Sequence, residues 1–413
     1  MKKNERFVIT GLAGAKTLQG EIKVAGAKNA IVAAMPMSVL FDDAVLFENV
    51  PAIEDVMRMQ ELLDGELPVL KKEIAERLRA SIILTGPVLA RYGEVTFPYP
   101  GGCVLGERPI DLFLEGFKAM GAEVEETELF RVRARGGLAG ARIIFPFVSV
   151  TATETLMLAA VLAKGETILQ NAAMEPEIAT LAEYINRCGG HIEGAGTPEI
   201  RIMGTAGKCL RANGVPYRTP PDRIEAGSFV LLAALAGKEI TVTGCEPKHM
   251  GALLTLLAKS GVPLEVGVDS ITVRAGDIQN ERYKTVSVRT HEYPGFPTDL
   301  QAPMAVFLSQ TSGEGTILET IFDGRFRYAD DLVRMGADIT VMNPHRILIR
   351  GPKKLTKKNL ESPDLRAGLA YILAASVAEG VSTIDNAYVI DRGYEHIEER
   401  LRNLGLNIRR ETV

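Results

Sequence analysis

One thiol lies in a segment that is too rich in glycine and proline to be a regular helix or strand. Cys103 follows Pro100 and two glycines, and Arg108 comes five residues later. Proline lacks a backbone donor and glycine loses the most entropy on ordering, so we expect an exposed loop at 99–109. A nearby cation makes a thiol more reactive. The segment predicts either a thiol that donates a proton or attacks in a site closing over an anion, or a packed cysteine at a tight turn.

A second segment of this kind surrounds an aspartate. Residues 293–297 contain two prolines and a glycine, and Asp299 follows them where a helix over 300–308 is expected to begin. Aspartate is a favoured helix cap, and it also serves as a general base. The sequence therefore leaves two interpretations of Asp299, a cap or a base at the mouth of a cleft.

Cations stand where the predicted helices begin. Lys28 and Asn29 open an apolar helical run over 30–40, and the positive end of a helix favours anions. Arg79 precedes another apolar run, which places it at a cleft edge or on a solvated helix face. A solvated lysine near a cap is the other interpretation of Lys28.

Three arginines of the second half lie in loop-like sequence, each near a glycine, a proline or an acid. The planar guanidinium group suits phosphate and carboxylate. Each arginine alone also fits a structural ion pair, but together with Lys28 and Arg108 they indicate a polyanion site between two domains. The three are Arg325, Arg366 and Arg392.

A recurring unit positions these residues. Each copy has a β-rich run, a helical segment that a glycine ends, and usually a second pair of β-rich runs. The helix-ending glycines are 65, 121, 189, 261, 336 and 405. A period of about 70 residues favours six compact α/β units, three in each of two domains. The first copy lacks the strand pair after Gly65 and continues into a helix over 66–80, and the helix of the last copy is expected from Gly393 to Gly405. The paired prolines in 218–223 indicate a crossover between the halves.

Composition excludes several classes of protein. A chain of 413 residues exceeds one ordinary core, and a net charge of −5 argues against binding nucleic acid. Four cysteines without CxxC spacing indicate free thiols in a reducing compartment. The five histidines lack metal-ligand spacing, no nucleotide-binding glycine motif occurs, and no apolar run reaches 18 residues. We expect a cytoplasmic protein with no metal, cofactor or membrane span.

Ordered motifs along nearly the whole chain resemble the UDP-N-acetylglucosamine 1-carboxyvinyltransferase family, enolpyruvyl transferases of peptidoglycan synthesis. The motifs are Gly26-Ala-Lys-Asn-Ala, Arg79-Ala-Ser-Ile, Pro100-Gly-Gly-Cys-Val-Leu-Gly-Glu-Arg-Pro-Ile-Asp, Asn171-Ala-Ala-Met-Glu-Pro-Glu-Ile, Asp222-Arg-Ile-Glu-Ala-Gly, Tyr293-Pro-Gly-Phe-Pro-Thr-Asp, Asp364-Leu-Arg-Ala and Asp391-Arg-Gly-Tyr. The resemblance implies a two-domain inverted α/β barrel with helices inside and sheets outside. One domain would span 19–219, and 1–18 with 220–413 would form the other.

The resemblance also implies a reaction, in which the enolpyruvyl group of phosphoenolpyruvate moves to the 3′-hydroxyl of UDP-N-acetylglucosamine and phosphate leaves. It implies that Cys103 donates a proton to C3 from a closing loop, and that Asp299 contacts the attacking hydroxyl. Lys28, Arg108 and Arg392 would hold the anionic groups of phosphoenolpyruvate, with Arg366 nearby. The remaining implied substrate contacts are Asn29, Arg79, Pro109, Ile110, Asp111, Leu112, Ser149, Val150, Ile321, Arg325 and Asp364.

Four departures from the family pattern concern the nucleotide side. Phe113 stands where a histidine is common, Phe147 where a lysine is common, and Gly324 where an asparagine precedes Arg325. The fourth departure is the absence of the strand pair after Gly65, which the family usually has. They leave open an enolpyruvyl transferase with a different nucleotide or sugar acceptor. The related 5-enolpyruvylshikimate-3-phosphate synthase is disfavoured, because Gly26-Ala-Lys-Asn stands in place of its serine-bearing lysine motif and that enzyme has no equivalent cysteine loop. A non-catalytic sugar-nucleotide binder is the alternative from another class, and the intact Cys103 and Asp299 argue against it.

Overall fold

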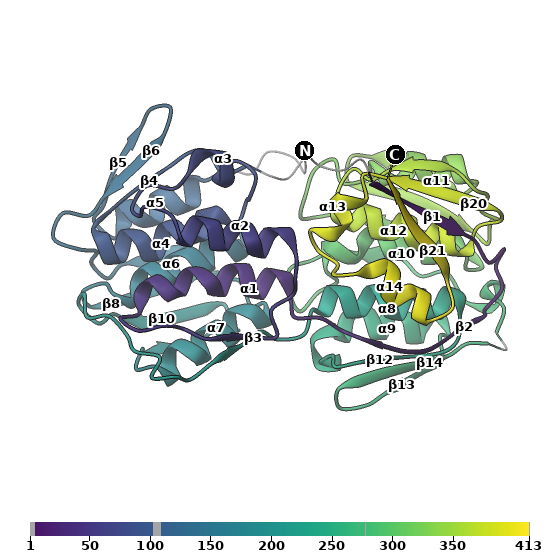
Figure 1. The fold of residues 1–413 in the computed structure, drawn as a ribbon, viewed down its shortest axis with the longest axis horizontal. Helices are drawn as coiled ribbons and strands as arrows, with labels where there is room; N and C mark the ends of the chain where they lie inside the picture. The colour runs from purple at the N-terminus through teal and green to yellow at the C-terminus, as the bar shows by residue number, and fades with distance from the viewer. Residues whose placement is uncertain (1–4, 102–108, 277, 413) are drawn as a thin grey trace. The chain divides into compact units, whose positions relative to one another are not determined.

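The computed structural model describes residues 5–101, 109–276 and 278–412 (Figure 1). They form two compact units, one of residues 5–25 and 221–412 and one of residues 26–101 and 109–220. Within these residues no helix combines the length and apolar character that crossing a bilayer requires. The predicted free thiols Cys188, Cys209 and Cys245 are unpaired cysteines, whereas Cys103 lies outside the described residues.

The described strands of the unit 5–25 and 221–412 form three four-stranded sheets of mixed direction. The first has the order β19 (Asn359–Glu361), β20 (Val381–Asp385), β1 (Glu5–Thr10), β21 (Asn407–Thr412). The second has the order β13 (Leu264–Val266), β14 (Ser270–Arg274), β12 (Gly237–Thr243), β2 (Leu18–Lys23). The third has the order β15 (Val288–Arg289), β16 (Gly313–Leu318), β18 (Arg346–Gly351), β17 (Asp338–Asn343).

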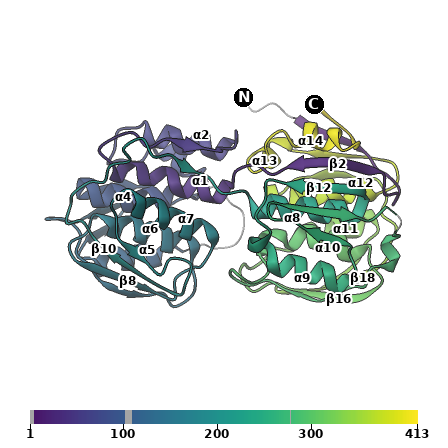
Figure 2. The same ribbon diagram turned by 90° about the horizontal axis from the view of Figure 1, so that it is seen from below.

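Three helices that are apolar on nearly every face fill the middle of this unit, as Figures 1 and 2 show. They are α8 (Arg223–Ala236), α10 (Gln301–Ser309) and α12 (Leu365–Val377), and they contact one another. A helix that is apolar all round must be buried. Helices with one polar face accompany them: α9 (Gly251–Ser260), α11 (Tyr328–Met335) and α14 (Ile397–Asn403).

The unit 26–101 and 109–220 repeats this plan with fewer strands. Its buried helices are α1 (Lys28–Ala34) with the 3-10 turn η1 (Met35–Leu40), α4 (Ser81–Tyr92) and α6 (Val150–Val161). Its other helices are α2 (Glu54–Leu63), α3 (Lys72–Ala75), α5 (Asp111–Ala119) and α7 (Pro176–Arg187). Its sheets are β7 (Arg142–Ile144), β8 (Glu166–Gln170), β10 (Glu199–Met203), β9 (Ile192–Glu193); β4 (Glu94–Phe97), β6 (Phe130–Arg133), β5 (Glu123–Glu126); and β11 (Tyr217–Arg218), β3 (Phe47–Glu48).

Local sequence signals account for these elements with four corrections. The predicted helix-ending glycines 121, 189, 261, 336 and 405 have φ between 88° and 113°, the left-handed conformation that stops a helix. Gly65 does not adopt this conformation, and α2 ends at Leu63 with Asp64 as its C-cap residue. The helix expected after Gly65 is reduced to α3. The helix expected from Gly393 begins at Ile397. The boundary expected at residue 19 lies after Ala25, because β2 pairs with β12 inside the unit 5–25 and 221–412.

Candidate active site

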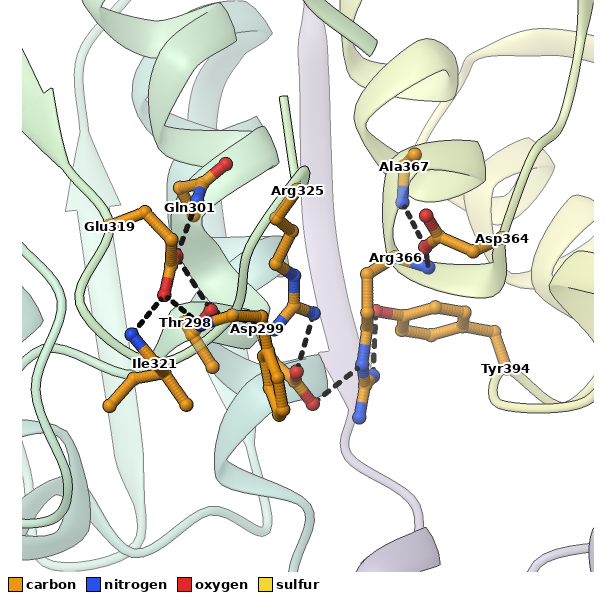
Figure 3. A network of polar contacts seen from close by, with 11 residues as sticks. Thr298, Asp299, Gln301, Glu319, Ile321, Arg325, Asp364, Arg366, Ala367 and Tyr394 are labelled. Carbon is orange, nitrogen blue, oxygen red and sulfur yellow. Dashed lines mark hydrogen bonds and ion pairs between the residues drawn. The ribbon is translucent and has the colours of Figure 1, made fainter. Parts of the chain in front are cut away.

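Asp299 lies in the 3-10 turn η4 (Thr298–Leu300), which leads directly into the buried helix α10. The N-cap residue of α10 is Leu300, so the interpretation of Asp299 as the cap is wrong. Arg325 Nη2 donates to Asp299 Oδ1 at 2.7 Å and Arg366 Nε donates to Oδ2 at 3.1 Å (Figure 3). The Asp299 side chain is 24% exposed, against 7% and 6% for the two arginines. An accessible carboxylate is thus oriented by two buried cations.

A buried glutamate holds the Arg325 side of this cluster. Arg325 Nη1 donates to Thr298 Oγ1 at 2.7 Å, and the same hydroxyl donates to Glu319 Oε2 at 2.7 Å. Glu319 is 1% exposed, and its other oxygen accepts the backbone N–H of Ile321 at 2.8 Å. A hydroxyl can accept one bond while it donates another. Glu319 therefore sets both the rotamer of Thr298 and the backbone at Ile321.

The Arg366 side is fixed by a helix cap and a tyrosine. Asp364 caps α12, because its Oδ1 accepts the backbone N–H groups of Arg366 at 2.8 Å and Ala367 at 2.9 Å. Arg366 Nη1 donates to the Tyr394 hydroxyl at 2.9 Å. Burial opposes the charge on Arg366, but Tyr394 and Asp299 outweigh it and raise the pKa of the guanidinium. Burial raises the pKa of the Tyr394 hydroxyl to about 12.

Arg392 lies two residues before Tyr394 in the chain. It is the C-cap residue of α13 (Ala387–Asp391), and it is partly exposed. The short helix and the turn after it therefore bring Arg392 next to a residue that belongs to the Asp299 cluster.

Lys28 is the first residue of α1, in the other unit. Its ammonium forms an ion pair with Asp55 Oδ2 at 2.9 Å, and the two side chains are 14% and 3% exposed. Asp55 lies in the first turn of α2, on the same face as the buried Met59 and Leu62. The next residue, Asn29, is exposed.

Arg79 contacts both ends of the segment that carries the thiol. Its Nη1 donates to the Pro100 carbonyl at 3.2 Å and its Nη2 reaches the Pro109 carbonyl at 3.5 Å, the limit for such a bond. Its guanidinium carbon lies 5.9 Å from the centre of the Tyr99 ring. Cys103 and Arg108 themselves lie outside the described residues.

The chain is similar to known proteins over nearly its whole length. The model of the family described as EPSP synthase (3-phosphoshikimate 1-carboxyvinyltransferase) matches residues 12–401. A protein of Koribacter versatilis named UDP-N-acetylglucosamine 1-carboxyvinyltransferase is 39% identical, and one of the same name from Acidobacterium capsulatum is 42% identical. Each alignment covers 98% of this chain and 96% of the relative. The chain belongs to the UDP-N-acetylglucosamine 1-carboxyvinyltransferase family.

Solved structures confirm the fold class of this family for the chain. The enolpyruvyl transferase NikO from Streptomyces tendae matches with a TM-score of 0.87 at 21% identity, over the full length of both chains. EPSP synthase from Acinetobacter baumannii matches with a TM-score of 0.70 at 18% identity, over 99% of this chain and 100% of the other. The predicted α/β enolpyruvyl transferase fold is therefore confirmed.

The remaining predicted contacts of the family pattern lie at helix starts. Pro109 and Asp111 are exposed, Ile110 is buried and Leu112 is partly buried, at the beginning of α5. Ser149 caps α6 by accepting the N–H of Ala152 at 3.3 Å, and Val150 follows it. Exposed N-terminal N–H groups of a helix favour anionic ligands.

The three side-chain departures from the family pattern differ in their surroundings. Phe113 is 2% exposed and belongs to the core of its unit, whereas Phe147 is 54% exposed beside the start of α6. Gly324 has φ of 65° and open space where a Cβ would stand. Asparagine also tolerates this backbone conformation, so the exchange leaves the turn before Arg325 intact.

Sequence reasoning missed three residues that contact predicted site residues or their neighbours within a unit: Asp55, Glu319 and Tyr394. A signal was available for Asp55, because it precedes Met59 and Leu62 by four and seven residues, the spacing of one helix face. An acid on an apolar face needs a partner, and Lys28 is that partner. Glu319 and Tyr394 gave no comparable signal, since each acts through a residue distant in sequence.

Proposed function

We propose that this protein transfers the enolpyruvyl group of phosphoenolpyruvate to the 3′-hydroxyl of UDP-N-acetylglucosamine and releases phosphate, the first committed step of peptidoglycan synthesis in the cytoplasm. Two relatives at 39% and 42% identity carry the name of that activity. The observation on which the proposal rests is the Asp299 carboxylate, which is accessible yet oriented by Arg325 and Arg366. Such an arrangement suits a base that must meet a hydroxyl beside an anionic substrate.

The reaction has two stages. The 3′-oxygen forms a bond to C2 of phosphoenolpyruvate as its proton passes to Asp299, and C3 gains a proton from Cys103. The resulting tetrahedral adduct then loses a C3 proton to the Cys103 thiolate and breaks the C2–O bond to phosphate, and the departing phosphate takes the proton from Asp299. Atoms and charge balance without a cofactor or an oxidant.

The cations hold the trianionic substrate in this proposal. Lys28, Arg108 and Arg392 bind its phosphate and carboxylate with Arg366 nearby, and positive groups already in place stabilise the charge that develops at phosphate. Asn29, Arg79 and Arg325 orient the substrates. The contacts to the sugar nucleotide come from Pro109, Ile110, Asp111, Leu112, Ser149, Val150, Ile321 and Asp364.

One assay tests the proposal against its alternatives. Phosphate release from phosphoenolpyruvate is measured with UDP-N-acetylglucosamine, other UDP sugars, other nucleotide sugars and shikimate 3-phosphate, for the wild type and Cys103→Ala. Turnover with UDP-N-acetylglucosamine that Cys103→Ala abolishes supports the proposal. Preference for another nucleotide supports the alternative acceptor that the exposed Phe147 suggests. Turnover with shikimate 3-phosphate alone, or none, overturns the proposal.

A second measurement addresses the thiol directly. An epoxide analogue of phosphoenolpyruvate is expected to alkylate Cys103 when the sugar nucleotide is present, adding one adduct mass in intact-mass spectra. Cys188, Cys209 and Cys245 serve as internal controls, since burial raises the pKa of each of these thiols and keeps it protonated. An adduct on one of these three, or none, would contradict a reactive Cys103.

A further inference from the structure

Arg410, near the end of the last strand β21, binds three carboxylates at once. Its Nη1 and Nη2 donate to the two oxygens of Asp391, each at 2.8 Å. Its Nε and Nη2 donate to the two oxygens of Glu398 at 2.7 and 3.1 Å, and Nη1 also donates to Glu5 at 3.0 Å. Every nitrogen of the guanidinium is used, and this geometry requires an arginine.

The three carboxylates come from separate elements. Glu5 begins β1, Asp391 ends α13 and Glu398 lies in the first turn of α14. Arg410 therefore joins the edge of one sheet to two helices. The bidentate pair with Asp391 fixes the residue that immediately precedes Arg392.

The other side of Arg392 is held as well. Tyr394 accepts a hydrogen bond from Arg366, which in turn donates to Asp299. Between the two supports the chain makes a tight turn, in which the Ile390 carbonyl accepts the N–H groups of Gly393 at 3.0 Å and Tyr394 at 3.1 Å. A displacement of Asp391 would therefore reach the backbone of Arg392 without being absorbed by a flexible loop.

The turn is also closely packed. A Cβ placed on Gly393 would come 2.7 Å from Leu365 Cδ1, so the backbone there lies directly against the start of α12. Ile390 is fully buried and contacts the position of Gly368 in the same helix. The support of Arg392 is thus a continuous set of contacts from β21 to α12.

We propose that Arg410 is a positioning residue that holds Arg392 in place to bind phosphoenolpyruvate, which deepens the proposed function and rests on it. The ion pairs are a quarter to a third exposed, so solvent weakens their contribution to stability. The ion pairs act instead by fixing the position of Arg392, because a misplaced guanidinium binds phosphoenolpyruvate less tightly. Hydrogen bonding to Asp391 and Glu398 outweighs burial and raises the pKa of Arg410, which keeps the network charged.

The test compares Arg410→Lys with Arg409→Lys. Arg409 neighbours Arg410 on β21, its side chain is 58% exposed, and it contacts Glu411. Lysine keeps the charge but cannot bind two carboxylates in a bidentate way. Arg410→Lys should raise KM for phosphoenolpyruvate about 10- to 100-fold. KM for the nucleotide substrate should stay within about twofold, and Arg409→Lys should match the wild type.

Two outcomes for Arg410→Lys would overturn the proposal. An unchanged KM for phosphoenolpyruvate in Arg410→Lys, or an equal rise for both substrates, would show that Arg410 has only a structural role. If Arg410→Lys unfolds at the assay temperature, Asp391→Asn decides by the same criteria, because it leaves the Glu398 and Glu5 pairs in place. Arg392→Lys is measured alongside. If that variant binds phosphoenolpyruvate normally, the role proposed for Arg392 fails, and with it the proposed function of the site rather than the support by Arg410.

Discussion

Arg366 and Asp299 are 67 positions apart in the chain, and a hydrogen bond of 3.1 Å joins the Nε of one to the Oδ2 of the other. Arg366 lies in the first turn of α12 and Asp299 precedes α10, and these two buried helices contact each other in the middle of their unit. The packing of two apolar helices therefore determines where the carboxylate points. Arg325 binds the second oxygen, and the Asp299 side chain remains 24% exposed.

Asp299→Asn should reduce kcat for phosphate release by about 10²- to 10⁴-fold, the usual contribution of a positioned general base. The amide cannot take the hydroxyl proton, although it keeps the size of the side chain. Asp323→Asn is the matched control, since Asp323 is 82% exposed and lies close to Arg325 in sequence. A kcat within a few-fold of the wild type in Asp299→Asn, measured by steady-state phosphate release, would remove Asp299 from the role of base.

The sequence predicted the repeating elements because their signals are local. Gly261 and Gly336 end their helices with a left-handed backbone, which glycine adopts at little steric cost. The prediction failed where tertiary packing, rather than local sequence, determines the backbone conformation. Residues 393–396 were expected to be helical, but Gly393 lies against Leu365, and His396 has φ of 44° as the N-cap residue of α14. No helical residue adopts that conformation.

Prediction of the candidate site was limited in the same way. Residue type and loop setting marked Asp299, Arg325 and Arg366 one by one, but their common cluster depends on helices that the sequence does not place relative to one another. Glu319 was missed because its bonds go to Thr298 and to the turn after itself. Residues that support a site through other side chains have no fixed spacing in the sequence, so only the packed structure identifies them.

Lys28→Met should destabilise the unit that contains it as well as weaken substrate binding. The variant leaves Asp55, which is 3% exposed, without its ammonium partner, and the loss is expected to be about 2–3 kcal/mol. Urea unfolding measures it. Lys118→Met is the control, because the Lys118–Glu115 pair is exposed on both sides and should change stability by less than about 0.5 kcal/mol.

A double-mutant cycle separates the free energy of the Lys28–Asp55 ion pair from other effects of Lys28. Adding Asp55→Met to Lys28→Met should destabilise less than the sum of the single changes, because the buried acid is then gone. Additive losses would show that the ion pair does not couple the two residues, and that Lys28 acts elsewhere.

Gly86→Ala should destabilise the chain by about 1–3 kcal/mol or more, because a Cβ at this position would lie 2.2 Å from the Thr155 carbonyl oxygen. The contact joins α4 to α6, so the helices would have to separate. Gly251→Ala is the opposite case, with φ of −51° and open space at the Cβ, and helix propensity predicts a gain of about 0.5–1 kcal/mol. Thermal unfolding of both variants checks the pair, and a Tm for Gly86→Ala equal to that of the wild type would contradict the close packing.

Glu154→Gln should change how stability depends on pH. Glu154 lies in the apolar helix α6 and is 3% exposed. Burial, and after it the charges of Glu177 and Glu175, raise the pKa of its carboxyl well above the ordinary range. In the unfolded chain the same carboxyl has the ordinary glutamate pKa of about 4.3.

The sign follows from proton linkage. Between the unfolded and the folded pKa the native state holds a proton that the unfolded chain has released, so the free energy of unfolding falls as pH rises through this window, by at most about 1.4 kcal/mol per pH unit. Glutamine carries no such proton. The free energy of unfolding of the variant should therefore match that of the wild type near pH 4.5 and exceed it by a growing margin up to pH 8. Urea unfolding at pH 4.5, 6 and 8 provides the comparison, with the exposed Glu183→Gln as control. Parallel pH profiles for Glu154→Gln and the wild type would mean that Glu154 is ionised in the folded protein at neutral pH.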